Sequence, residues 1–192
     1  MKKTFIGISF LASLLLIFSS CNVKEILTHD VEINDKVIEF DLGPTGVKQQ
    51  VAKVVSSESE VNLLDSTFAL NVEEKISDLG FSVNLIKSLL LTSAKLEVQV
   101  PLEFADDVNG FMQCFSNMKI YFDDKSQLVA KGSDITTSGQ TGIVNINIVN
   151  GELLNKLKQD QLRIILTGSK YPEAMVHVKF ITNYKVKVGL TK

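Results

Sequence analysis

Apolar and polar residues alternate along several stretches of this chain with the two-residue period of a half-buried strand. The clearest stretch is 176–188, where one face is apolar and the other carries lysines, with Ile181 as the exception. The apolar face holds Val176, Val178, Phe180, Thr182, Tyr184, Val186 and Val188, and the other face holds His177, Lys179, Asn183, Lys185 and Lys187. This pattern predicts an antiparallel strand with one solvated face.

Four further segments carry local signals. Residues 31–42 alternate but break at Asn34-Asp35, which predicts a hairpin or strand pair, and 51–64 reads as an exposed or edge strand. Residues 71–80 have a helix start and stop, with Asn71 as the cap and Gly80 as the left-handed residue that ends the helix. A helical crossover is expected over 105–115.

The Gly-, Ser- and Thr-rich residues 132–141 predict a flexible polar loop between strands at 128–131 and 142–149. Many short strands joined by short helices favour an all-β fold, a two-sheet antiparallel β-sandwich of immunoglobulin-like or jelly-roll-like form. No expected helix has the length of a βαβ crossover. We assign residues 31–192 to this single domain.

The first twenty residues have a different pattern. Lys2 and Lys3 precede an almost wholly apolar run from Phe5 to Phe18, and Ser19 and Ser20 follow it. A basic start, an apolar core and small residues at the end are the layout of a secretory signal peptide. The apolar core is shorter than the ~20 residues that a permanent membrane span needs. Residues 1–20 are therefore expected to be a signal peptide.

The residues that follow resemble the lipobox of bacterial lipoproteins. Phe18-Ser19-Ser20-Cys21 matches that motif except at Phe18, where leucine is usual. The resemblance covers about the first 21 residues. It implies cleavage before Cys21 by signal peptidase II and a diacylglycerol on the Cys21 sulfur, so that a lipid anchors the chain to a membrane.

Residues 21–30 are then a lipidated tether, and the protein is placed in the cell envelope. Asn22 differs from the Asp that retains enterobacterial lipoproteins at the inner membrane, which favours the outer membrane. Envelope lipoproteins of Bacteroidota fit the same lipobox. Lys24-Glu25 departs from their acidic surface-export tags, so the sequence leaves open whether the protein faces the periplasm or the cell surface.

Charge and cysteine content narrow the function. Removal of residues 1–20 deletes two of the 20 basic residues and none of the 22 acidic ones, which gives a mature net charge of about −4. Arg163 is the only arginine. A nucleic-acid-binding protein carries a basic face, so nucleic acid is not an expected partner. With Cys21 lipidated, Cys114 has no cysteine to pair with, and it is expected to be a buried thiol.

The residues that could carry catalysis are few. His29 lies in the tether, and His177 is expected on the solvated face of its strand. Acids cluster at Asp106-Asp107 and Asp123-Asp124, but the spacing fails for an EF-hand Ca²⁺ loop, so these acids are expected at turns or helix caps. The mature chain lacks the set of His and Cys ligands of a zinc site. We expect no catalytic residues, no metal site and no cofactor.

A binding surface is expected in the loops. Tyr171, beside Pro172, is the best candidate for an exposed aromatic contact, and Ser133 and Thr137 in the expected loop 132–141 are the second choice. The leading hypothesis is a lipid-anchored, non-enzymatic binding or assembly module with an envelope protein or glycan as partner. Two alternatives stay open, a carrier of a lipid or other apolar ligand and a glycan-active hydrolase whose acids converge in three dimensions.

Overall fold

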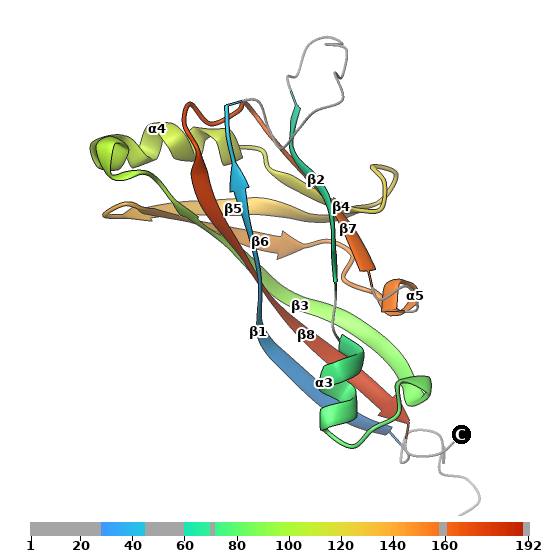
Figure 1. Cartoon of the computed structure of the whole chain (residues 1–192). Helices are drawn as coiled ribbons and strands as arrows, with labels where there is room; N and C mark the ends of the chain where they lie inside the picture. Colours follow the sequence, from blue (N-terminus) through green and yellow to red (C-terminus); the bar gives the residue numbers. More distant parts are fainter. Residues whose placement is uncertain (1–27, 45–59, 70–71, 158–160, 190–192) are drawn as a thin grey trace, which may run out of the picture.

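The computed structural model describes residues 28–44, 60–69, 72–157 and 161–189. These residues form eight strands and six short helical segments, which Figure 1 shows. The elements are β1 (Thr28–Leu42), β2 (Val61–Ala69), α3 (Val72–Asp78), η1 (Val83–Leu85), β3 (Ile86–Gln99), η2 (Leu102–Asp107), α4 (Val108–Met112), η3 (Gln113–Phe115), β4 (Lys119–Phe122), β5 (Leu128–Ser138), β6 (Thr141–Ile148), α5 (Leu154–Leu157), β7 (Gln161–Gly168) and β8 (Val176–Gly189).

The eight strands form one continuous antiparallel sheet in the order β1-β8-β3-β6-β5-β4-β7-β2. The sheet curls into a half-barrel, and its two edge strands approach each other where the rings of Phe40 and Phe68 lie 6.1 Å apart. The prediction of an all-β class with short helices in the connections is confirmed. The division into two sheets differs from the structure, because alternation along each strand looks the same whether two inner faces belong to two sheets or to one curled sheet.

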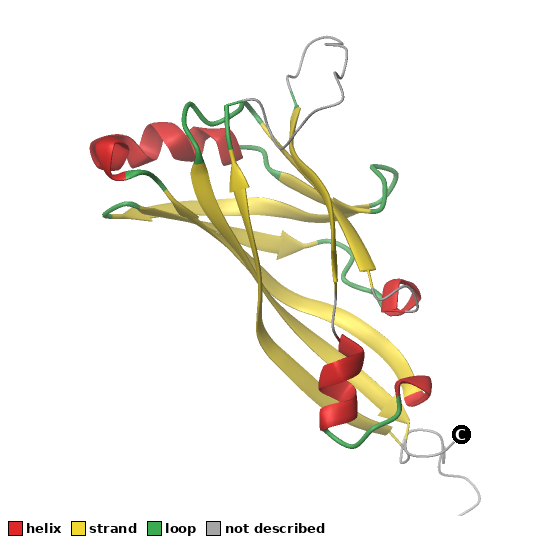
Figure 2. Ribbon diagram, viewed as in Figure 1, coloured by secondary structure: helices red, strands yellow, loops and turns green. Residues whose placement is uncertain are grey.

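Strands β1, β8 and β3 are 15, 14 and 14 residues long and form an extended ribbon (Figure 2). The predicted alternation of β8 is confirmed, and two of its lysines pair with acids of the neighbouring edge strand. Lys185 Nζ lies 2.8 Å from Asp30, and Lys179 Nζ lies 3.2 Å from Glu39. These pairs are partly exposed and add little to stability, so the outer face of the ribbon is a solvated surface.

The two ends of this ribbon organise the molecule. At one end Thr28 pairs with Gly189, beside α3 and η1; we call this the α3 end. At the other end Leu42 pairs with Val176, and the segment η2–α4–η3 crosses the sheet; we call this the α4 end. Figure 1 shows the two helical segments at opposite ends of the fold.

The hairpin expected in 31–42 is wrong. β1 runs through Asn34-Asp35 as a bulge, with a register shift between Ile33 and Lys36. Asp35 has a positive φ of 53°, and its N–H donates to Asn183 Oδ1 at 2.7 Å. Residues 28–30 of the expected tether also belong to β1. The 51–59 part of the expected edge strand lies outside the described residues, but β2 is indeed at a sheet edge.

The helix expected at 71–80 is confirmed as α3, with Asn71 outside the described residues. The Phe81 N–H donates to Ile76 O at 3.1 Å and the Gly80 N–H donates to Ser77 O at 2.8 Å, and Gly80 has a φ of +81°. These two bonds are the Schellman pattern, which satisfies the last carbonyls of a helix. Ile76 is fully buried and belongs to the hydrophobic core, so α3 covers the inner face of the ribbon.

The flexible loop expected at 132–141 is wrong. Residues up to Ser138 continue β5, and β6 begins at Thr141, so the two strands form a hairpin that turns at Gly139, whose φ is +56°. All six side chains from 133 to 138 are exposed. This part of β5 therefore lacks the buried apolar positions that would predict a strand, and its polar composition is typical of a loop.

Candidate functional site

Three irregular segments of the described chain meet at the α4 end. They are the helical segment η2–α4–η3, the loop 169–175 between β7 and β8, and the Gly43 turn after β1. Two of the three residues expected to make contacts lie here, Thr137 at the tip of the β5–β6 hairpin and Tyr171 in the 169–175 loop. Ser133 lies further along β5, where its hydroxyl donates to Asn145 O at 3.1 Å.

Neither Thr137 nor Tyr171 is an exposed side chain without contacts. Thr137 Oγ1 donates to Asn109 Oδ1 at 3.1 Å, which ties the hairpin tip to α4. Tyr171 is half-buried and packs against the hydrophobic core. The exposed aromatic platform expected at Tyr171 is therefore only partly available.

The sequence of the helical segment explains its shape. Pro101 precedes η2, and Asp107 begins α4 by accepting a hydrogen bond from the Gly110 N–H at 3.2 Å. A Cβ added at Gly110 would meet the Asp107 carboxylate, so glycine leaves room for this cap. Asp107, which the sequence placed at a turn or helix cap, is the N-cap of α4.

This segment is fixed directly onto the sheet. Cys114 O accepts the Ser169 N–H at 2.9 Å, and Ser116 O accepts the Ser169 hydroxyl at 2.6 Å. Gly168 and Gly142 contact Cys114 and Met112 so closely that a Cβ on either glycine would collide. The helices therefore pack on β7 and β6 at these points without space for an apolar ligand between them.

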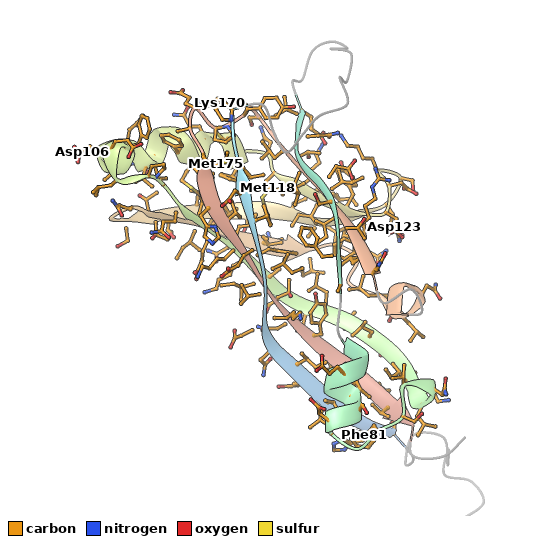
Figure 3. All side chains as sticks on the ribbon, in the orientation of Figure 1. Phe81, Asp106, Met118, Asp123, Lys170 and Met175 are labelled. Carbon is orange, nitrogen blue, oxygen red and sulfur yellow. The ribbon has the colours of Figure 1, made fainter. Side chains whose placement is uncertain are left out.

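Three large apolar side chains remain exposed at this end. Leu102 is 78% exposed, Met175 is 58% exposed and Phe104 is 36% exposed. The Phe104 ring lies 5.1 Å from that of Phe111, which is buried, so it is held in place from below. We call these three residues the apolar end surface. Of these three residues, Figure 3 labels Met175.

Sequence reasoning missed the apolar end surface. Leu102 and Phe104 lie in a short 3₁₀ segment that has no periodic pattern, and Met175 is 71 residues away from Phe104 in the chain. The only local signal for this surface was the presence of apolar residues just after Pro101, at the end of a strand.

The residues that could carry catalysis are either paired on the surface or buried in the core. His177 Nδ1 lies 2.9 Å from Asp41 Oδ1 on the solvated face of the ribbon. Cys114 is buried, and burial raises the pKa of its thiol, which disfavours the nucleophilic thiolate. Among residues 28–44, 60–69, 72–157 and 161–189, no three His, Cys, Asp or Glu side chains are grouped to hold a metal ion.

The Asp123-Asp124 pair lies at a turn. Asp124 Oδ1 accepts the Ser126 N–H at 2.7 Å, and Asp123 has a φ of +65°. The Arg163 guanidinium donates to Asp123 O at 3.0 Å and binds both carboxylate oxygens of Asp65 at 2.7 Å. The hydrogen bond with Arg163 lowers the pKa of Asp65. Arg163 therefore joins β7 to β2 through its ion pair with Asp65, and it also holds the turn at Asp123.

The described residues contain no helix long and apolar enough to cross a membrane. No protein-family model and no curated protein matches the chain. One similar solved structure is titled Desmodium yellow mottle tymovirus; it is 8% identical, the alignment covers 84% of this chain and 93% of that one, and the TM-score is 0.26.

Proposed function

We propose that this chain is a lipid-anchored protein of the cell envelope that binds a protein partner through the apolar end surface and catalyses no reaction itself. One geometric observation carries the proposal. Cys21, the residue expected to hold the lipid, lies seven residues before Thr28 in the sequence, and β1 begins at Thr28 at the α3 end of the ribbon. The apolar end surface lies at the opposite end. A membrane anchor and a contact surface are thereby separated along one rigid element.

The dimensions suit this arrangement. A strand rises ~3.3 Å per residue, so the 15 residues of β1 extend over roughly 45 Å. A lipid on Cys21 would hold the α3 end near the membrane and present the α4 end away from it. Several acyl chains on one cysteine make such an anchor durable.

The chemistry of the apolar end surface favours a protein over a glycan. Protein interfaces combine an apolar centre with a polar rim. Leu102, Phe104 and Met175 supply exposed apolar area, and the partly exposed pair Lys170–Glu173, 3.5 Å apart, lies on the same loop as Met175. Tryptophan is absent, and Tyr171 is half-buried, so the stacking platform expected of a glycan site is weakly represented.

Replacing Cys21 with serine tests the anchor. Serine cannot form the thioether, so we expect the variant to lack lipid and either to leave the membrane fraction or to remain as an uncleaved precursor. Fractionation with metabolic labelling by radioactive palmitate measures both effects. A Cys114→Ser variant is the matched control, because it removes the other cysteine and should keep lipid and membrane association. Normal lipid labelling of Cys21→Ser would contradict the proposal.

A photo-crosslinking residue tests the contact surface. We expect a discrete adduct when the crosslinker replaces Leu102, because this side chain is the most exposed large apolar group at the α4 end. The control position is Leu90, which is 39% exposed but lies on β3 opposite Lys185, away from that end. Gel electrophoresis after irradiation in intact cells measures the adducts. The same adduct from both positions, or from Leu90 alone, would contradict a partner site at the α4 end.

A further inference from the structure

The α3 end carries one strongly exposed apolar side chain with partly exposed ones beside it. Leu79 is 54% exposed at the end of α3, whereas Phe81, Val83 and Leu85 in the following segment are partly buried and pack against the hydrophobic core. They alternate with the exposed residues Gly80, Ser82 and Asn84. We call Leu79, Phe81, Val83 and Leu85 the apolar tip. Figure 3 labels Phe81 at this extremity of the fold.

Two hydrogen bonds and one ring contact hold the apolar tip against α3 and β1. The hydrogen bonds from Gly80 and Phe81 to the last turn of α3 close the helix, and the positive φ of Gly80 turns the chain back toward the ribbon. The Phe81 ring then stacks on His29 with centroids 5.6 Å apart. Leu79, one residue before the left-handed glycine, is left pointing outward without such a partner surface, as its exposure shows.

The stacking on His29 places the tip beside the start of β1. His29 is the second residue of β1, and seven residue steps separate Thr28 from Cys21. Seven extended steps span at most about 25 Å. A bilayer that holds a lipid on Cys21 is therefore within reach of the tip, whereas the apolar end surface is separated from it by the length of the ribbon.

We propose that the apolar tip inserts into the interface of the bilayer that holds the lipid, as a second membrane contact beside Cys21. This inference rests on the proposed anchor. Interfacial segments bury their apolar face about 5–10 Å into the boundary between head groups and acyl chains. The partner of this tip is therefore a lipid surface. The exposed charges next to it in sequence, Asp78 and Lys87, have opposite signs, so the contact depends on apolar burial and Lys87 can extend toward the head groups.

The absence of tryptophan makes a direct test simple. Mature, lipidated protein with Leu79→Trp is reconstituted into vesicles of phosphatidylethanolamine and phosphatidylglycerol, with and without brominated acyl chains. We expect blue-shifted emission that the brominated lipid quenches. Leu102→Trp at the opposite end is the matched control and should keep red-shifted, unquenched emission. Asn84→Trp provides a second reporter on the tip, and circular dichroism verifies the fold of each variant.

The outcomes separate this inference from the proposed function. Protein that floats with the vesicles while neither tip reporter is quenched would leave the Cys21 anchor in place and overturn the insertion. Quenching of Leu102→Trp equal to that of Leu79→Trp would also overturn it, because the ribbon would then lie flat on the membrane. Failure of the purified wild-type protein to carry lipid or to float would overturn both proposals.

Discussion

Replacing Gly168 with alanine is expected to lower the free energy of unfolding by about 3 kcal/mol. Gly168 ends β7 directly beneath the backbone carbonyl of Cys114, and an added methyl group would collide with that oxygen. The same carbonyl accepts the Ser169 N–H at 2.9 Å. Backbone cannot rotate away as a flexible side chain can, so the η3 segment would have to lift from the sheet and lose this hydrogen bond.

Gly43→Ala is the matched control for this substitution. A Cβ at Gly43 would lie 3.1 Å from the terminal methyl of Met175, which is the far end of a flexible, exposed side chain. Both substitutions remove the same conformational freedom from the unfolded chain, an effect of about 0.4–1 kcal/mol. We expect Gly43→Ala to leave the urea midpoint nearly unchanged and Gly168→Ala to lower it at constant slope. Equal midpoints for the two variants would show that η3 can move without cost.

Local signals predicted the parts of this fold that local chemistry determines. The alternation of β8 follows from its two faces, and the end of α3 follows from one glycine in the left-handed region. Asn34-Asp35 and residues 133–138 failed for different reasons. The bulge at Asp35 is stabilised by Asn183, which is 148 residues away in the chain, and no local pattern reports that partner. Residues 133–138 pair with the neighbouring strand of their own hairpin, but their side chains are all exposed, so no buried apolar position marks them as a strand.

The candidate site was likewise predicted only in part. Sequence reasoning placed contacts in loops at one end of the fold, and Thr137 and Tyr171 do lie at the α4 end. It could not find Leu102 or Met175, because exposure of an apolar side chain depends on how η2 and the 169–175 loop are fixed to the sheet. The close contact of Cys114 with Gly168, which fixes them, joins residues 54 positions apart.

Replacing Phe115 with alanine is the second substitution with a large expected effect. Phe115 is among the largest fully buried side chains, and it belongs to the hydrophobic core from its position in η3. Truncation of a buried phenylalanine costs about 3–5 kcal/mol, because transfer free energy is lost and a cavity remains. Chemical denaturation of the lipid-free, folded Cys21→Ser background measures this loss in the absence of detergent.

Phe104→Ala is its counterpart on the same helical segment. Phe104 is partly exposed and packs mainly on Phe111, so we expect a loss of only about 1 kcal/mol. If the apolar end surface binds a partner, however, Phe104→Ala should reduce the adduct formed from a crosslinker at Leu102 while the protein stays folded. Phe115→Ala should reduce the adduct only in proportion to the unfolded fraction. A Phe104→Ala protein as unstable as Phe115→Ala would make that ring part of the core and would remove it from the contact surface.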